Sequence, residues 1–456
     1  MDSLGSSASY DLVVFGATSF VGQIVCRYLM ERYGAGGSLR WAMAGRSEEK
    51  LQALQESLGT EAVGIGRMLV DARDQGTLDA MCRQTRVVAS TVGPYALYGE
   101  PLVQACVESG TDYCDLTGEV PWMRRMIERY SEAARQSGAR IVHCCGFDSI
   151  PSDLGVWFLQ QEALRNYNQV CTQVKLRVAD AKGGVSGGTV ASLLNVVEQA
   201  VGSRAIRQGL ADPYWLCIDS VADRIQQPSD MPIAFDPDFD RWISPFVMAG
   251  INTRVVHRTN ALLGYPYGQS FRYDEAVLLG KGLGSRMQAN VVGLGLGVFL
   301  TATAFGPLRY LLRRWVLPKP GQGPSLATQE KGYFDLRLFG RTAQGQTLQV
   351  QVTGDRDPGY GSTAKMLGEA AVCLGTELDR SERPGGFWTP ASAFGDRLRK
   401  RLEERAGVCF VRIEGRKSLD WKGAESRRAE RWLNGRSSTS IKEIRCETWC
   451  RKSVSC

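Results

Sequence analysis

Two glycines with a serine between them form the most informative chemical pattern in this sequence. Gly16 ends an apolar run that starts at Tyr10, and Gly22 opens an amphipathic stretch. This pattern predicts a strand, a tight turn and a helix. Gly16 can adopt the backbone angles of the turn, and Gly22 lets the helix lie close to the strand. The free N–H groups and positive dipole end of the helix then face an anion, which predicts pyrophosphate binding.

Ser19 stands where the usual dinucleotide fingerprint has its second glycine, because the spacing here is G-x-x-S-x-x-G. Its side chain narrows the approach to the pyrophosphate slightly, although its hydroxyl can donate a hydrogen bond to it. A plain strand-to-helix turn is the alternative interpretation. We assign the pyrophosphate contact to the residues of this turn, which are Gly16, Thr18, Ser19, Phe20, Val21 and Gly22.

The residue after the second predicted strand, 39–44, decides between the two nicotinamide dinucleotides. An acidic residue there binds the ribose hydroxyls of NAD, whereas an arginine accommodates the 2′-phosphate of NADP. The sequence has Arg46 and no carboxylate before Glu48. It therefore favours NADP over NAD, the alternative being that Arg46 is a solvated surface charge. Asp71, at the end of the third predicted strand, is expected to contact the adenine.

The nicotinamide side of the cofactor is assigned to the end of the fourth predicted strand, 87–91. This strand runs into a Gly-Pro pair, after which the chain does not continue as a helix. Its carboxyl end therefore lines the crevice in which ligands bind in open parallel sheets. The residues assigned to this side are Thr91, Val92, Gly93 and Pro94.

Candidates for proton transfer lie at the ends of the next two strands. Tyr113 and Asp115 belong to one end, and Asp148 and Ser149 to the other. Functional groups gather at such carboxyl ends, but Asp and Ser are also ordinary helix caps, so both interpretations stay open. A metal site is not expected, because the thirteen cysteines and two histidines lack the spacing that zinc requires.

An alternating fold is needed to bring these residues together. Strands and helices alternate from residue 10 to residue 143, which predicts an α/β fold with a doubly wound parallel sheet. The 456 residues exceed what one core usually serves, and a second α+β domain with a mixed or antiparallel sheet is expected. We predict a flexible N-terminus over 1–9, a Rossmann cofactor-binding domain over 10–150 and a second domain over 151–400.

Several short motifs occur in order along the chain: Gly-Ala-Thr-Ser-Phe-Val-Gly at 16–22, Ala-Gly-Arg at 44–46, Thr-Val-Gly-Pro-Tyr at 91–95, Tyr-Gly-Glu-Pro-Leu-Val at 98–103, Asp-Tyr-Cys-Asp-Leu-Thr-Gly-Glu at 112–119, Cys-Gly-Phe-Asp-Ser-Ile-Pro-Ser-Asp at 145–153 and Ser-Gly-Gly-Thr at 186–189. Together they resemble the saccharopine dehydrogenase-like oxidoreductases, in the branch with the trans-acting enoyl reductases. The resemblance implies a second domain over the nicotinamide end and an active site between the domains. It also implies a small-molecule or lipid substrate.

One segment of the second domain complicates a soluble interpretation. Residues 287–308 carry no charge, and Arg309, Arg313 and Arg314 follow at once. About 20 apolar residues can cross a bilayer, and basic residues suit its interface. Four glycines and a proline weaken the segment as an isolated helix, so a buried or hinge helix is the alternative. We favour a membrane or lipid-droplet surface, with the segment lying on the interface rather than spanning it.

The positive charge of the chain is concentrated near its C-terminus. Residues 411–456 carry 12 basic and 6 acidic side chains, a net of +6 against +7 for the whole chain. No nucleic-acid partner is expected, since no recognition motif accompanies this charge. A disordered tail is favoured over an anionic-lipid contact or an altered reading frame. Without a secretory signal, we expect an intracellular protein, cytoplasmic where it is not membrane-associated.

Two classes of function follow from these observations. The first is an NADP-dependent reductase of a lipid-related carbonyl or enoyl group. The second is a membrane-surface or lipid-droplet protein that keeps the cofactor fold without turnover. A saccharopine dehydrogenase is a third and weaker reading, because no convincing set of basic residues for a substrate with several carboxylates is present. A homodimer is left open.

Overall fold

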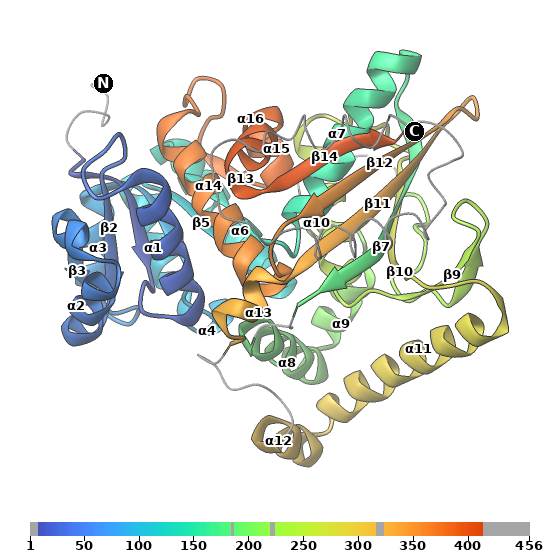
Figure 1. Cartoon of the computed structure of the whole chain (residues 1–456), viewed down its shortest axis with the longest axis horizontal. Helices are drawn as coiled ribbons and strands as arrows, with labels where there is room; N and C mark the ends of the chain where they lie inside the picture. The colour runs from blue at the N-terminus through green and yellow to red at the C-terminus, as the bar shows by residue number, and fades with distance from the viewer. Residues whose placement is uncertain (1–7, 184–186, 219–223, 316–322, 414–456) are drawn as a thin grey trace, which may run out of the picture.

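The computed structural model describes residues 8–183, 187–218, 224–315 and 323–413, which form two seven-stranded sheets with helices around them (Figure 1). The strands are β1 (Tyr10–Phe15), β2 (Trp41–Gly45), β3 (Gly66–Leu69), β4 (Thr85–Ser90), β5 (Asp112–Asp115), β6 (Arg140–Val142), β7 (Cys171–Lys182), β8 (Ala234–Asp236), β9 (Arg241–Pro245), β10 (Arg272–Leu278), β11 (Tyr333–Thr342), β12 (Thr347–Gly354), β13 (Gly386–Trp388) and β14 (Val408–Ile413). The helices are α1 (Phe20–Tyr33), α2 (Glu48–Ser57), α3 (Gln75–Arg83), α4 (Tyr95–Tyr98), α5 (Glu100–Ser109), α6 (Val120–Ser137), α7 (Ile150–Tyr167), α8 (Gly187–Gly202), α9 (Arg204–Ala211), α10 (Ala249–Leu262), α11 (Gly282–Ala304), α12 (Gly306–Trp315), α13 (Leu326–Glu330), α14 (Thr363–Thr376), α15 (Pro390–Phe394) and α16 (Asp396–Arg401).

The first sheet holds the predicted alternation of strands and helices. Its order is β13-β6-β5-β4-β1-β2-β3, and every neighbouring pair is parallel. Leu12 and Val14 of β1 join a core with α1, α2 and α14, whereas Val13 and Phe15 join a core with α3, α5 and α6. Because β1 is buried on both faces, its sequence is a continuous apolar run. The predicted Rossmann-type sheet is confirmed.

The second sheet is mixed, as the sequence predicts. Its order is β14-β12-β11-β7-β10-β9-β8. β7 and β10 are parallel, and the other neighbouring pairs are antiparallel. The sequence is rich in β-forming residues near 173–179, 270–279, 332–339 and 347–353, and these stretches correspond to β7, β10, β11 and β12. Helix α7 leaves the first sheet and packs on β11 and β12.

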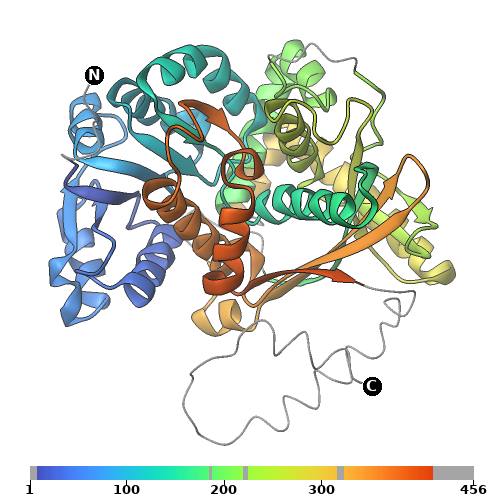
Figure 2. The same cartoon turned by 90° about the horizontal axis from the view of Figure 1, so that it is seen from above.

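The chain returns to the first sheet after most of the second is complete. β13 pairs in parallel with β6, and α14 packs on β1, β4 and β5 beside α1. In Figure 2 this orange-to-red part of the chain lies against the blue and teal elements of the first sheet. The predicted second domain spans 151–400, but α14 and β13, which lie within that range, join the first sheet. An apolar helix and a three-residue strand carry no pattern that tells which sheet they join.

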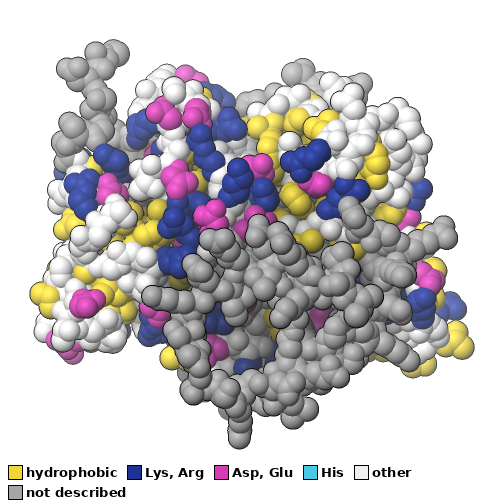
Figure 3. Space-filling model, turned by 45° about the horizontal axis from the view of Figure 1, so that its top comes forward, with side chains coloured by type: hydrophobic (Ala, Val, Ile, Leu, Met, Phe, Trp, Pro, Cys, Tyr) yellow, Lys and Arg dark blue, Asp and Glu magenta, His cyan; other side chains and the backbone are white. Residues whose placement is uncertain are grey.

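The surface carries charges of both signs. On the face shown in Figure 3, basic and acidic side chains lie side by side. Exposed ion pairs in the described chain include Arg397 with Glu382 and Arg135 with Glu132. Exposed pairs of this kind contribute only about 0–1 kcal/mol each to stability.

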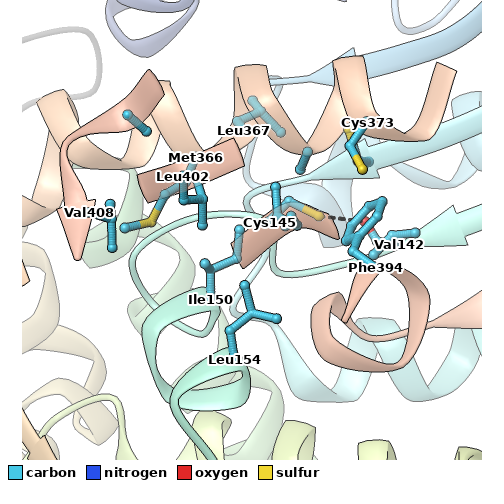
Figure 4. Close-up of a cluster of buried hydrophobic side chains, with 14 of the residues drawn as sticks. Val142, Cys145, Ile150, Leu154, Met366, Leu367, Cys373, Phe394, Leu402 and Val408 are labelled. Carbon is cyan, nitrogen blue, oxygen red and sulfur yellow. Dashed lines mark hydrogen bonds between the residues drawn. The ribbon is translucent and has the colours of Figure 1, made fainter. Parts of the chain in front are cut away.

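A shared apolar core joins the part of the chain that returns to the elements that lead out of the first sheet. Figure 4 shows Met366 and Leu367 of α14 facing Cys145, Ile150 and Leu154, with Phe394, Leu402 and Val408 around them. All of these side chains are buried in one cluster. These shared apolar side chains therefore hold the two sheets together, because they would be exposed to water if the two parts were separate.

The predicted apolar segment 287–308 falls in α11 and the start of α12, with a break in the helix at Phe305. Both helices lie at the outside of the second part of the molecule (Figure 1). Here the first part means the elements around the first sheet, and the second part means those around the second sheet. The basic tail predicted over 411–456 begins later than expected, because β14 extends to Ile413 and pairs with β12. Residues 414–456, like residues 1–7, lie outside the described residues.

Candidate active site

The turn between β1 and α1 has the geometry that phosphate binding requires. Gly16 has a φ of +84°, a conformation that favours glycine. A Cβ at Gly22 would lie 2.1 Å from the carbonyl oxygen of Gly16, so only glycine allows this approach of helix and strand. Ser19 caps α1 and accepts a hydrogen bond from the N–H of Gly22 at 2.9 Å. The N–H groups of Phe20 and Val21 donate to no other described residue, which leaves them for an anion.

A hydroxyl pair ties this turn to the end of β4. The Oγ atoms of Ser19 and Thr91 lie 2.9 Å apart, and Thr91 also donates to the carbonyl oxygen of Gly16 at 3.0 Å. The hydroxyl of Ser19 thus has a protein partner besides any phosphate. The structure brings the two predicted cofactor segments, 16–22 and 91–94, to one edge of the sheet.

The residues predicted for the adenosine end lie at the ends of the neighbouring strands. Arg46 follows β2, is exposed, and makes no ion pair or hydrogen bond within the described chain. Its guanidinium is thus available for a 2′-phosphate. Asp71 follows β3 and is half-buried, and its Oδ1 accepts the backbone N–H of Arg73 at 3.0 Å. The residues present fit an adenine dinucleotide with a phosphorylated ribose.

Glu119 links the segment after β4 to the second part of the molecule. Its buried carboxylate accepts the N–H groups of Tyr95 at 2.7 Å and Ala96 at 3.2 Å. The same carboxylate accepts from Ser192 and Asn195 of α8, each at 2.9 Å. One side chain therefore holds α4, which follows Pro94, and a helix of the second part together. Sequence reasoning missed Ser192 and Asn195, since no motif marks them.

Tyr113 and Asp115 lie in the interior beneath this edge. Asp115 accepts hydrogen bonds from the hydroxyl of Tyr113 at 3.0 Å, from the N–H of Cys144 at 3.1 Å, and pairs with Nδ1 of His143 at 2.7 Å. Burial and the charge of Asp115 raise the pKa of Tyr113 well above its usual value. This network orders the ends of β5 and β6, and the catalytic assignment of both residues stays a prediction.

Asp148 and Ser149 follow β6 in one loop but have different surroundings. Ser149 is fully buried and donates to Oδ1 of Asn252 at 2.9 Å, so it does not cap α7 with its side chain. Asn252 in turn donates to Glu275 at 2.9 Å. Asp148 is half-buried and has no hydrogen-bond or ion-pair partner among the described residues. Burial raises the pKa of Asp148 to about 6.

Side chains from the second part contact both loops. The ring of Phe20 meets that of Tyr360 edge-on, with centroids 4.9 Å apart, and the hydroxyl of Tyr360 accepts the N–H of Gly187 at 3.1 Å. Phe147, next to Asp148, packs on Phe334 of β11 with ring centroids 4.8 Å apart. The phosphate turn thus contacts the segment that follows β12, and the loop of Asp148 contacts β11 of the second sheet. In the described ranges, no group of three His, Cys, Asp or Glu side chains is arranged to hold a metal ion.

Known proteins match both the first part and the whole of this chain. A family model described as the saccharopine dehydrogenase NADP-binding domain matches residues 12–142. A Mycobacterium tuberculosis protein provisionally named a trans-acting enoyl reductase is 41% identical over 408 residues, which cover 88% of this chain and 96% of the relative. A trans-acting enoyl reductase of Mycobacterium bovis is 38% identical over 410 residues, with 86% and 95% covered.

Among solved structures, the apo form of a saccharopine dehydrogenase (L-Glu forming) from Saccharomyces cerevisiae aligns over 88% of this chain and 99% of its own. Its TM-score is 0.47 and its identity 13%, a similarity too low to bear on function. The family model carries more weight, because it spans β1 to β6 and is that of an NADP-binding domain. The predicted cofactor, NADP, is confirmed.

Proposed function

We propose, because the chain belongs to the saccharopine dehydrogenase-like oxidoreductase family in the branch of the trans-acting enoyl reductases, that it reduces the enoyl group of a lipid-linked substrate with NADPH. Its membership and its NADP-binding domain make it an NADP-dependent oxidoreductase. The observation that carries the choice of substrate is the alignment of named enoyl reductases over 95–96% of their own lengths. The sequence interpretation left a carbonyl group and an enoyl group open, and these names favour the enoyl group.

The chemistry requires one hydride and one proton. NADPH, when bound, supplies the hydride. The carbon–carbon double bond takes up the hydride at one carbon and a proton at the other, so the substrate is reduced and NADP⁺ remains. The protein must therefore hold a proton donor beside the acyl group and exclude water from the reacting carbons.

Asp148 is the proton donor we propose. Of the four sequence candidates, Tyr113, Asp115 and Ser149 are fully buried and hydrogen-bonded within the protein. Asp148 alone is partly exposed, without a partner in the described chain. Its pKa of about 6 keeps a fraction of the carboxyl protonated near neutral pH. Its neighbour Phe147 contacts β11, so Asp148 lies where the two parts of the molecule meet.

The test is the oxidation of NADPH by the purified full-length chain in the presence of trans-2-dodecenoyl coenzyme A. We expect loss of NADPH absorbance and a product heavier than the substrate by two hydrogens. Asp148→Asn is expected to lower the turnover rate about 10²-fold or more while leaving NADPH binding intact. The rate of the wild type should fall as the pH rises through about 6, because the protonated carboxyl is the active form.

The matched control is Glu61→Gln, the same kind of change at an exposed carboxylate in the first part of the molecule. It should leave rate and pH profile unchanged. NADPH binding without oxidation by any enoyl thioester would contradict the proposed reaction. Oxidation of saccharopine with NADP⁺ in place of enoyl reduction would assign the chain to the third reading instead.

A further inference from the structure

Helix α11 turns its large apolar side chains outward. Leu283, Met287, Val291, Leu294 and Val298 are each between 65% and 81% exposed. With 3.6 residues per turn, these five lie within about 80° of the helix circumference. A surface helix of a soluble protein has the opposite arrangement, with polar side chains toward water. Among the described residues, α11 is the one helix long and apolar enough to cross a bilayer.

The opposite side of α11 is packed on the protein. Ala289, Gly293 and Thr303 are buried, and the Cβ position of Gly293 lies against Ile233. The helix contacts β8, β9 and α8 along this side. A transmembrane orientation would break this packing, whereas an orientation parallel to a surface preserves it. Figure 1 shows α11 as a straight helix at the edge of the molecule, next to α8.

The outward apolar surface continues past the end of α11. Phe305, Leu308 and Tyr310 are all exposed, between 41% and 64%. Soluble monomers rarely expose a continuous apolar surface of this extent unless it contacts a partner or a membrane. The tyrosine adds an amphipathic ring of the kind that gathers at membrane interfaces. We call these three side chains and the five of α11 the α11 face.

The charges near the α11 face indicate what kind of surface it binds. From residue 281 to residue 315, which covers α11 and α12, the sequence has no Asp or Glu, and its five cations are Lys281, Arg286, Arg309, Arg313 and Arg314. Lys281 pairs with Asp240 and Arg309 with Glu198 of α8, whereas Arg286 lies over the ring of Trp242. The face in Figure 3, by contrast, mixes both signs of charge. An apolar stripe with basic flanks is complementary to a bilayer that carries anionic lipid.

We propose that the α11 face docks on a membrane containing anionic phospholipid, with α11 in the plane of the interface. The proposal does not depend on the substrate of the enzyme. It also gives α8 a place between the lipid and the candidate site, because α8 packs on α11 and its Ser192 and Asn195 bind Glu119. A lipid-linked substrate would then reach the site from the side on which the protein docks.

The experiment is flotation of the full-length chain with vesicles of phosphatidylcholine and phosphatidylserine in equal parts. Wild type should float with these vesicles, less with phosphatidylcholine alone, and less at high salt. The double substitution Met287→Glu and Leu294→Glu should weaken partitioning into the vesicles at least about a hundredfold. It removes two apolar side chains that the bilayer would bury and adds two anions. Both substitutions lie on the exposed side, so the stabilisation of the fold by NADPH should not change.

The matched control is Val63→Glu, which adds an anion at a valine that is 81% exposed in the first part of the molecule. It should float as wild type does. Every variant keeps residues 414–456, so any contribution of that basic segment cancels in the comparison. Equal binding to neutral vesicles would overturn the anionic-lipid assignment. A wild type that never floats, and is a dimer that the double substitution makes monomeric, would show the α11 face to be a homodimer interface.

Discussion

Helices α1 and α11 both place glycine among apolar residues, yet the structure uses the glycines in opposite ways. A Cβ at Gly22 of α1 would lie 2.1 Å from the carbonyl oxygen of Gly16. Cβ atoms at Gly284, Gly295 and Gly297 of α11 would meet nothing within 4 Å. Contact within the chain explains the glycine of α1. Gly293 of α11 has a comparable contact, with Ile233, but these three glycines have none among the described residues, which directs attention to what lies outside the protein.

The two helices also differ in the apolar side chains that accompany their glycines. Val25 and Leu29 of α1 are fully buried against the first sheet, whereas Leu283 and Met287 of α11 face outward. An apolar pattern in sequence thus has two structural meanings. Where a sheet covers the apolar side chains, the pattern indicates a packed core. Where no part of the described chain covers them, it indicates a surface that contacts something else.

The largest expected effect comes from Gly22→Ala. The new Cβ forces α1 away from the turn, and we expect destabilisation of about 3 kcal/mol. We also expect loss of the stabilisation by NADPH, which is about 2.7 kcal/mol at a hundred times the dissociation constant. Thermal unfolding with and without NADPH measures both. A variant that NADPH stabilises as fully as wild type would break the contrast with α11.

Asp148→Asn probes a carboxyl at the same edge of the sheet that has no partner among the described residues. The pKa is about 6 in the folded chain against 3.8 without burial. Below pH 3.8 the carboxyl is protonated in both states and costs nothing; as the pH rises from 3.8 to about 6, the unfolded chain loses its proton first and stability falls, and above 6 the penalty stays constant. Removing it should therefore stabilise the protein by up to about 3 kcal/mol near pH 8 and by nothing near pH 3.

Urea unfolding at several pH values measures this difference. Glu61→Gln, at an exposed site, should show no such pH dependence. A constant difference between Asp148→Asn and wild type at every pH would mean that Asp148 is ionised in the same way in both states. In that case its surroundings would not distinguish it from an ordinary surface carboxylate.

Arg46→Ala tests whether the site beside α1 is built for an external ligand. Loss of a charge-assisted contact with the 2′-phosphate should weaken NADPH binding by about 10- to 100-fold, equivalent to roughly 1.5–3 kcal/mol. NADH binding should be unchanged, because NADH lacks that phosphate. Isothermal titration calorimetry with NADPH and NADH measures both affinities. An equal loss of affinity for the two cofactors would mean that Arg46 has a general structural role and does not contact the 2′-phosphate.

The smallest effect is expected for Gly295→Ala, the counterpart of the first substitution. Nothing lies within 4 Å of the new methyl group, and alanine favours helix over glycine. We expect stabilisation by about 0.5–1 kcal/mol, measured by thermal unfolding in the absence of lipid. Destabilisation would reveal a contact at this position and would weaken the comparison between the helices.

The first sheet could be predicted closely because its strands are short apolar runs punctuated by turn residues. The predicted strands 39–44 and 87–91 differ from β2 and β4 by one or two residues at each end. The return of the chain could not be predicted in the same way. β13 is three residues long, and its place beside β6 depends on contacts between segments more than 240 positions apart.

The candidate site was predictable where backbone geometry dictates residue type. Gly16 and Gly22 are fixed by the turn, and the structure places them as the pattern requires. The surroundings of the candidate side chains were harder to predict from the sequence. The sequence places Asp115 and Asp148 at equivalent strand ends, and only packing shows that Asp115 has several partners and Asp148 none among the described residues. Partners from distant segments, such as Asn195 for Glu119, leave no trace in local sequence.

The carboxylate of Glu119 has a consequence for how the molecule opens. It accepts hydrogen bonds from two N–H groups of α4 and from two side chains of α8, and Glu119 is fully buried. Separation of α8 from α4 would leave a buried charge half-solvated, which costs several kcal/mol. Partial opening is therefore disfavoured, and the amides of Tyr95 and Ala96 should exchange with deuterium only when α8 departs as a unit.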